Sequence, residues 1–168
     1  MSGTGSSLLV NVGDLRRRLG TRARMERSAV LDELELTGAT VPAGSAVELD
    51  LTLESIFDGV VATGTLRAPW EGDCRRCLQP VRGEIRPDFR EVFEVQPTEG
   101  ETFPLTGDQL DLEPLVREVV LLSLPLAPLC DEACTGPAPE SFPTAIEGGA
   151  EPDPDPRWAV LDELRFDR

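Results

Sequence analysis

The sequence predicts an α+β fold in which two helices pack on an antiparallel, barrel-like sheet of about five or six strands. Three observations favour this class. Apolar and polar residues alternate over residues 46–56, Asp58-Gly59 then supplies a hairpin turn, and apolar residues recur three and four apart after residue 111. The chain has 168 residues, of which 40% are hydrophobic, so one domain over residues 8–134 can bury a core.

The N-terminal part predicts a strand followed by a helix. Residues 1–7 are rich in glycine and serine, and we expect them to be disordered. Residues 8–12 are mostly apolar and predict a short strand. Asn11 or Asp14 can then cap a helix that extends to about Arg27, with leucines four apart on one face and arginines on the other.

The central part predicts a series of strands. Residues 31–36 mix apolar and acidic side chains, which is compatible with a first strand. Residues 46–56 and 60–68 are expected to pair as a hairpin. Residues 81–95 predict one long bent strand or two shorter ones, because Pro87 lacks the N–H that a continuous ladder needs.

The next part predicts a loop and the second helix. Residues 96–108 are acidic and carry proline and glycine, so we expect a loop, followed by a short strand at 109–112. Asp111 can cap the helix after it, and Pro125 ends that helix. The expected apolar stripe comprises Leu112, Leu115, Val116, Val119 and Leu122.

The final part differs in composition from the rest. Residues 135–168 form an acidic segment rich in proline and glycine, for which we expect a partly disordered tail. Asp155-Pro156 has the pattern of a helix start, which predicts a short helix at the end of the tail. Its apolar face would comprise Trp158, Leu161 and Leu164.

Composition limits the possible chemistry. The net charge is −15, from 31 acidic and 16 basic residues, and the sequence contains no histidine. The absence of histidine excludes Ser-His-Asp and Cys-His catalytic sites and any zinc site that needs imidazole. No phosphate-binding loop, paired-carboxylate motif or nucleophile with a base is present. We therefore expect a protein that is not an enzyme.

Apolar runs in the chain are short. Residues 8–12 are too few for a signal core, and arginines follow them instead of preceding them. Residues 119–129 contain two prolines and are too short to span a bilayer. We expect a cytoplasmic protein that does not bind membranes, in which cysteine pairs serve metal or redox chemistry more often than disulfides.

The basic residues are all arginines and are concentrated in residues 1–30 and 67–90. The planar guanidinium group can bind a phosphate with two hydrogen bonds, so these segments are candidates for RNA contact. The alternative is that each arginine pairs with one of the many acidic residues. The candidate RNA-binding residues are Arg16, Arg17, Arg18, Arg75, Arg76, Arg82 and Arg86.

Four cysteines form two closely spaced pairs, Cys74 with Cys77 and Cys130 with Cys134. Two such pairs can supply the four thiolates of a closed, structural zinc site. The gap between the pairs is long, so the second pair must fold back beside the first. Unliganded thiols and a redox disulfide are the two alternatives that the sequence leaves open.

Three segments together resemble the large ribosomal RNA subunit accumulation protein family, the YceD family of bacteria with plastid relatives. Cys74–Pro80 is similar to the family pattern C-x-R-C-x-x-P. Glu118–Cys130 resembles its helix, Leu-Pro and Pro-x-Cys segment. Asp155–Leu164 is similar to its C-terminal signature. The order and spacing of the segments also match, so the resemblance covers nearly the whole chain.

The resemblance implies a role in the accumulation or processing of large-subunit ribosomal RNA and in ribosome assembly. The expected partner is this RNA or a pre-ribosomal particle. The alternative is an acidic chaperone that binds a basic ribosomal protein, which the net charge would suit. Relatives with a richer second cluster have two further cysteines where this chain has Ala138 and Ser141. A four-thiolate site here must therefore include Cys74 and Cys77.

Overall fold

The structure is a computed structural model that describes residues 8–137. The chain divides into two compact units, Met1–Gly136 and Pro137–Arg168, and every helix and strand given below belongs to the first. The expectations for residues 1–7, for most of the acidic tail and for the helix after Asp155 lie outside the described residues.

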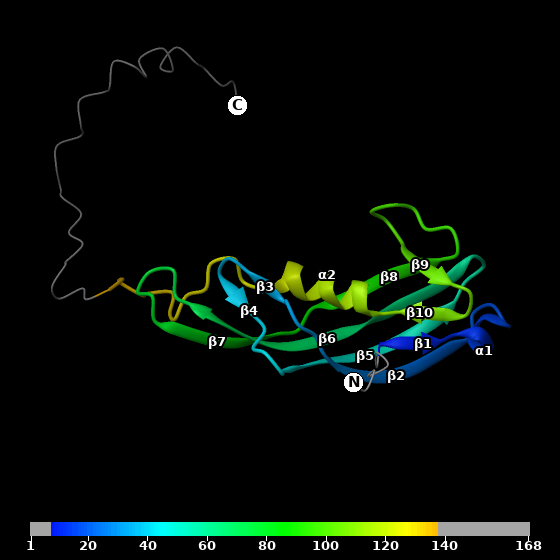
Figure 1. The fold of residues 1–168 in the computed structure, drawn as a ribbon, viewed down its shortest axis with the longest axis horizontal. Coiled ribbons are helices and arrows are strands. Elements are labelled where there is room, and N and C mark those ends of the chain that lie inside the picture. Colours follow the sequence, from blue (N-terminus) through cyan, green and yellow to red (C-terminus); the bar gives the residue numbers. More distant parts are fainter. Residues whose placement is uncertain (1–7, 138–168) are drawn as a thin grey trace, which may run out of the picture. The chain divides into compact units, whose positions relative to one another are not determined.

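The described residues are mostly β-structure, as Figure 1 shows. Their strands belong to one large sheet that is antiparallel except where β8 and β9 pair in parallel. In chain order the elements are β1 (Leu9–Asn11), α1 (Gly13–Arg16), β2 (Arg22–Val30), β3 (Glu35–Leu36), β4 (Ala39–Thr40), β5 (Ala46–Ser55), β6 (Gly59–Asp73), β7 (Pro80–Ile85), β8 (Asp88–Glu94), β9 (Phe103–Thr106), β10 (Gln109–Asp111) and α2 (Glu113–Ser123).

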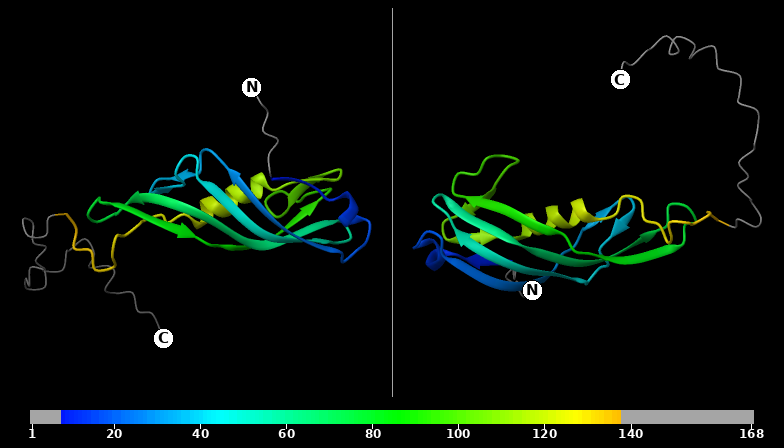
Figure 2. Two further views of the ribbon diagram at one scale, coloured as in Figure 1. Left: turned by 90° about the horizontal axis from the view of Figure 1, so that it is seen from below. Right: turned by 180° about the vertical axis from the view of Figure 1, so that it is seen from behind.

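Strand β6 is the longest strand and organises the sheet. Its first part lies between β5 and β8, and its last part lies between β4 and β7. Both of its ends lead into turns, at residues 56–58 before it and at residues 74–79 after it. Because one strand of fifteen residues joins these turns, they are held up to about 50 Å apart. Figure 2 shows this strand running the length of the sheet.

The prediction of a barrel-like sheet is wrong. The main path of the sheet runs β1-β10-β9-β8-β6-β4-β3, and its end strands β1 and β3 do not pair with each other. Those end strands have only three and two residues, which is too short to form the ladder that closure requires. The sheet is therefore open, and it has more strands than the five or six expected.

The predicted N-terminal helix is also mostly wrong. Helix α1 covers only Gly13–Arg16, and Gly20 with φ +74° interrupts the helical path. Arg22–Val30 instead forms β2, which pairs with β5 along its full length. Arg24 donates to Asp50 on β5 at 2.6 Å and 3.0 Å, which lowers the pKa of that carboxyl. Cross-strand partners that are distant in sequence therefore outweigh the local leucine spacing.

Several other strand predictions are confirmed, with changed boundaries. The hairpin formed by β5 and β6 has the expected turn, and Pro87 separates β7 from β8. Residues 109–112 contain β10 as expected. Of residues 31–36, only Glu35–Leu36 is strand, and β9 lies within the loop expected over residues 96–108.

Helix α2 confirms the second predicted helix. The Oδ1 atom of Asp111 accepts a hydrogen bond of 3.0 Å from the N–H of Glu113, and the helix ends before Pro125. The prediction that Leu122 belongs to the buried stripe of α2 is wrong, because this side chain is 80% exposed. Val120, which is not in the expected stripe, is buried instead. Figures 1 and 2 show α2 lying along one face of the sheet.

The core lies between that face and α2 and consists largely of leucine and valine. Phe93 on β8 is fully buried and stacks on Phe103 of β9, with ring centroids 5.3 Å apart. Inward-facing residues of β5 alternate with polar ones, as the sequence pattern predicts. The largest fully buried side chains are Leu8, Val12, Val47, Leu51, Leu53, Val60, Leu66, Phe93, Leu110, Leu112, Leu115 and Val116.

One buried hydroxyl has no hydrogen-bond partner among the described residues, namely Oγ of Ser55 at the end of β5. Because an unsatisfied buried hydroxyl costs about 1–3 kcal/mol, we expect Ser55→Ala to leave the free energy of unfolding unchanged or to raise it by about 1 kcal/mol. Urea denaturation would measure this. A fall in the free energy of unfolding by more than about 1 kcal/mol would show that the hydroxyl has a stabilising partner.

Among residues 8–137, no helix is long and apolar enough to cross a membrane.

Candidate metal centre

The first cysteine pair lies in the tight turn between β6 and β7. Asp73 pairs with Pro80 at the base of this turn. Within it, the N–H of Cys74 donates to the carbonyl of Gln79 at 2.8 Å, and the N–H of Leu78 donates to the carbonyl of Cys74 at 2.9 Å. Leu78 has φ +60°, a left-handed conformation that closes the turn. The backbone thereby fixes both thiols at the tip of the hairpin.

The second pair reaches this turn along the segment that follows α2. Past Pro125 the chain runs beside Gly38, where an added Cβ would lie 2.6 Å from the carbonyl oxygen of Leu126. Glycine thus permits a close backbone approach. The N–H of Arg75 then donates to the carbonyl of Pro128 at 2.9 Å, which ties the segment to the first turn.

A short turn orders the second pair itself. The Oδ1 atom of Asp131 accepts a hydrogen bond of 2.7 Å from the N–H of Ala133, and its carbonyl accepts one of 3.1 Å from the N–H of Cys134. Such an aspartate turn is stable locally without regular secondary structure. It places Cys130 and Cys134 facing the hairpin.

The four sulfur atoms lie within 4.8 Å of one another. The Sγ atoms of Cys77 and Cys130 are 3.6 Å apart, and those of Cys74 and Cys134 are 3.9 Å apart. A tetrahedral zinc ion with Zn–S bonds of about 2.3 Å places its ligands about 3.8 Å apart. All four cysteines are free, so the sulfur atoms are arranged as the corners of a site that can hold a metal such as zinc.

Hydrogen bonds from the backbone and between the sulfur atoms shift the pKa values of these thiols strongly. Hydrogen bonds from the backbone of Cys77 and then of Cys130 lower the pKa of Cys74 to about 6, although the thiol is buried. Hydrogen bonds with the sulfur atoms of Cys134 and Cys77 raise the pKa of Cys130 to about 12. The backbone, rather than the guanidinium groups of the turn, therefore favours the thiolate of Cys74.

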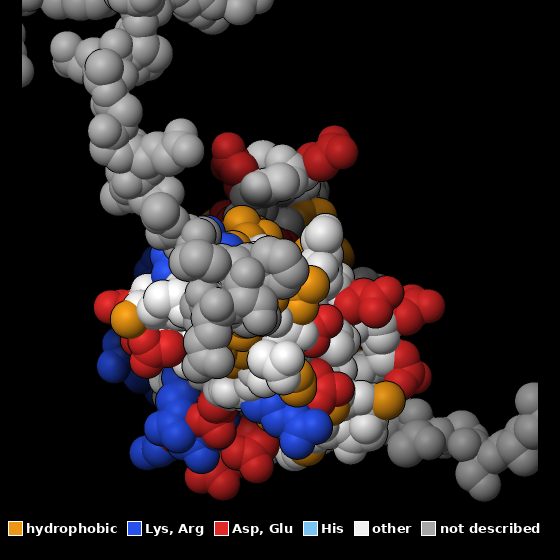
Figure 3. Space-filling view, turned by 90° about the vertical axis from the view of Figure 1, so that its left-hand side faces the viewer, with side chains coloured by type: hydrophobic (Ala, Val, Ile, Leu, Met, Phe, Trp, Pro, Cys, Tyr) orange, Lys and Arg blue, Asp and Glu red, His pale blue; other side chains and the backbone are white. Residues whose placement is uncertain are grey.

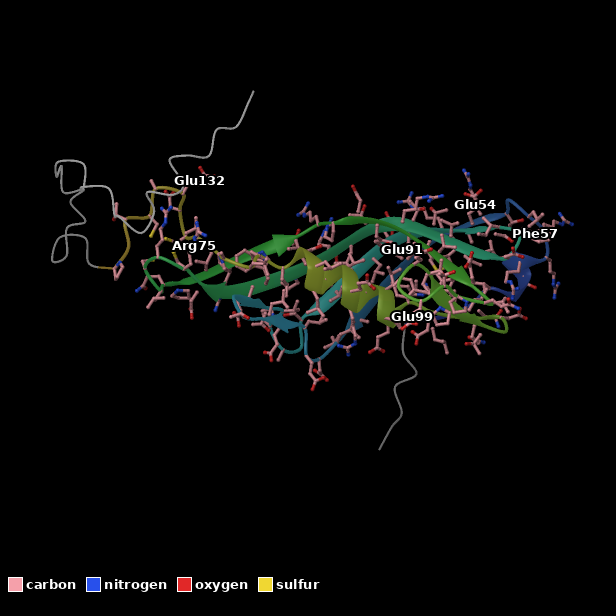
Figure 4. All side chains as sticks on the ribbon, turned by 90° about the horizontal axis from the view of Figure 1, so that it is seen from above. Glu54, Phe57, Arg75, Glu91, Glu99 and Glu132 are labelled. Atoms are coloured by element: carbon pink, nitrogen blue, oxygen red, sulfur yellow. The ribbon has the colours of Figure 1, made fainter. Side chains whose placement is uncertain are left out.

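Arg76 connects the two cysteine segments. Its Nη1 atom donates to the carbonyls of Glu132 and Cys134, at 2.8 Å each. Figure 4 shows Arg75 and Glu132 at the same end of the described structure. One guanidinium group thus holds the second turn against the first. The sequence alone does not indicate this role, because it depends on carbonyl groups more than fifty residues away.

Most of the other candidate RNA-binding arginines have carboxylate partners. Arg18 and Arg75 are exposed and have no ion pair within residues 8–137. In Figure 3, acidic and arginine side chains are interspersed on the visible face. The ion pairs are Arg16 with Asp108 at 3.4 Å, Arg17 with Asp14 at 3.2 Å, Arg82 with Glu71 at 3.3 Å, and Arg86 with Glu84.

The structure keeps the candidate RNA-binding arginines of residues 1–30 apart from those at the cysteine turn. Arg16 lies in a pocket with Phe57, next to the start of β6, whereas Arg75 and Arg76 follow the end of β6. The cysteine centre therefore has only the second cluster beside it. RNA contact by either cluster stays a prediction.

Both cysteine pairs lie in a region of the chain that matches a known protein family. The family model for the large ribosomal RNA subunit accumulation protein YceD matches residues 62–165, which include both cysteine pairs. No solved structure matches the chain.

Similarity to relatives extends over most of the chain. Uncharacterized proteins of Mycobacterium tuberculosis and Mycobacterium bovis are each 34% identical over 171 residues, which cover 95% of this chain and 82% of theirs. An uncharacterized protein of Mycobacterium leprae is 27% identical over 169 residues, covering 95% of this chain and 78% of its own. This chain belongs to the YceD family of large ribosomal RNA subunit accumulation proteins.

Proposed function

We propose that this protein is a non-enzymatic factor that supports the accumulation or processing of large-subunit ribosomal RNA in the cytoplasm. It does so by binding the RNA or a pre-ribosomal particle. Membership of the YceD family is the observation that carries this proposal. The absence of histidine from the whole sequence supports a binding role over a catalytic one.

A structural zinc ion at Cys74, Cys77, Cys130 and Cys134 is part of the proposal. Four thiolates fill a tetrahedral coordination sphere and leave no position for a substrate, which suits a structural site. The metal would join the β6–β7 hairpin to the segment after α2. Four thiolates around Zn²⁺ carry a double negative charge, and the guanidinium groups of Arg75 and Arg76 beside them would offset it.

Arg75 is the side chain best placed for RNA contact at this end. Its backbone is fixed by the hydrogen bond to Pro128, and its exposed guanidinium group has no ion pair within residues 8–137. By contrast, Arg82 on the neighbouring strand is 3.3 Å from Glu71. A guanidinium group without a carboxylate partner can bind phosphate without first losing an existing interaction.

We expect Arg75→Ala to weaken binding to a large-subunit ribosomal RNA fragment by roughly tenfold, which corresponds to about 1.4 kcal/mol. The dependence of affinity on salt should also fall by about one phosphate contact. Fluorescence anisotropy over a salt series would measure both. Arg24→Ala is the matched control and should change little, because two hydrogen bonds to Asp50 already occupy that guanidinium group. Wild-type binding that is absent or independent of salt would contradict the proposal.

The alternative function is that of an acidic chaperone for a basic ribosomal protein. The net charge of −15 and the pairing of most described arginines with carboxylates favour it. Affinity purification with and without ribonuclease separates the two functions. Recovery of ribosomal particles that ribonuclease abolishes supports RNA binding. Recovery of one basic ribosomal protein that ribonuclease does not affect supports the chaperone.

A further inference from the structure

Phe57 has the most exposed large apolar side chain among the described residues. It lies in the β5–β6 turn, which is closed by a hydrogen bond of 3.0 Å from the N–H of Ile56 to the carbonyl of Gly59. The Phe57 side chain is 85% exposed, and Figure 4 shows it at the end of the described structure away from Arg75. The hairpin turn needs no aromatic residue, so the ring is available to a ligand.

A pocket of about 380 Å³ adjoins this ring. Val95, which is 54% exposed, provides a second apolar contact in it. This size lies within the range of roughly 300–1,000 Å³ that is typical of small-molecule sites. The pocket, here called the Phe57 pocket, is lined by Arg16, Phe57, Asp58, Glu94, Val95 and Gln96.

The polar groups of the Phe57 pocket suit the edge of a nucleobase. The carboxylates of Asp58 and Glu94 can accept hydrogen bonds, and the amide of Gln96 can both donate and accept. Neither Asp58 nor Gln96 has a side-chain hydrogen bond or ion pair within residues 8–137. Guanine is the base that offers two adjacent donors, N1–H and N2–H, to one carboxylate. An aromatic ring with such polar groups beside it is how proteins hold unstacked RNA bases.

Arginines near the pocket can bind the phosphates that flank such a base. Arg17 and Asp14 form an ion pair whose side chains are 78% and 92% exposed, and a pair so open to water is weak. Arg18, the next residue, is exposed and has no ion pair in the described part of the chain. Arg16 has a different role, because its Nη1 atom donates to the carbonyl of Gly107 at 2.7 Å.

We propose that the Phe57 pocket binds an unpaired guanine of single-stranded RNA, stacked on the ring of Phe57. This inference rests on the proposed function and names the RNA feature that the turn before β6 contacts. A larger pocket lies over β2, β5 and β6, but it has no aromatic residue. Its Arg67 lies between two carboxylates, Glu48 at 3.8 Å and Glu84 at 3.7 Å, so it is less suited to RNA.

The test measures binding of the full chain to a short oligouridine with one central guanine, and to the same oligonucleotide without guanine. We expect the wild type to prefer the guanine-containing RNA. Base stacking is worth about 1–3 kcal/mol, so Phe57→Ala should weaken that binding by roughly fivefold or more. Phe57→Trp should preserve binding, whereas Phe57→Leu should behave as the alanine variant. Leu122→Ala, at another exposed apolar residue, is the matched control.

The outcomes separate this inference from the proposed function. Equal affinity of the wild type and Phe57→Ala for the oligonucleotides, together with Arg75-dependent binding to the ribosomal RNA fragment, would overturn the pocket and leave the function standing. No binding to either RNA would overturn both. If Phe57→Ala instead reduces recovery of a basic ribosomal protein and leaves RNA binding unchanged, the pocket is a protein-binding site and the inference is wrong.

Discussion

Cys74→Ser is expected to abolish stoichiometric zinc binding and to lower the free energy of unfolding by about 3 kcal/mol or more. Cys74 is the buried member of the four, and its loss leaves three thiolates. Because a metal ion held by all four thiolates needs both segments in place, its binding energy would contribute directly to folding. For a chain of this length, such a loss corresponds to a fall in Tm of roughly 10 °C.

Two measurements check this expectation. Metal analysis of protein purified without added zinc should give one zinc per chain for the wild type and far less for Cys74→Ser. Thermal unfolding should show the lower Tm for the variant, and a strong chelator should lower the Tm of the wild type. Ala133→Ser introduces the same hydroxyl into the neighbouring turn and should keep both the metal and the Tm. If the chelator leaves the Tm of the wild type unchanged, the zinc proposal fails.

Phe93→Ala is expected to lower the free energy of unfolding by about 3–5 kcal/mol, the usual cost of removing a fully buried ring. Phe93 is fully buried and stacks on Phe103, so its removal leaves a cavity between β8 and β9. The affected strands are distant in the fold from the cysteine turn. Zinc content should therefore remain at one per chain in the variant as long as it is folded.

Urea denaturation monitored by circular dichroism measures this effect. Phe57→Ala is the matched control, because it makes the same chemical change at a side chain that is 85% exposed. We expect it to change the free energy of unfolding by no more than about 0.5 kcal/mol. A similar loss in both variants would mean that the two phenylalanines are equally buried and that the described packing is incorrect.

The sequence predicted those elements whose signals are local. Alternation over residues 46–56 and the Asp58-Gly59 turn define the β5–β6 hairpin, and both signals act within a few residues. Pro87 separates β7 from β8 because proline lacks a donor wherever it occurs. Helix α2 likewise begins just after Asp111, although its N-cap residue is Leu112, and it ends before Pro125.

Elements that depend on distant partners were not predictable in the same way. Residues 15–27 have leucine spacing that suits a helix, yet Arg24 and its neighbours pair with β5 instead. Whether a sheet closes depends on its first and last strands, and β1 and β3 are too short to show a pattern. Local periodicity contains no information about either outcome.

The candidate site was predictable in its members but not in its surroundings. Spacing identified the four cysteines as possible ligands, and the structure brings their sulfur atoms together. The arginine clusters, however, show only that positive charge is present. Arg16 pairs with Asp108, which is more than ninety residues away in sequence, and Arg76 donates hydrogen bonds to backbone carbonyls. Composition cannot distinguish such arginines from those whose side chain has no ion pair in the described part of the chain, such as Arg75.

The distance in sequence between the two cysteine pairs has a consequence for folding kinetics. Cys77 and Cys130 are 53 positions apart in sequence. Bringing them together early in folding would therefore lose much chain entropy while forming few stabilising contacts. During synthesis, Cys74 and Cys77 also leave the ribosome well before their partners. The sheet and α2 must therefore assemble first, and capture of the proposed metal ion would be the last step of maturation. Under the zinc proposal, a cell short of zinc would accumulate a nearly complete protein in which the β6–β7 turn is not joined to the segment after α2.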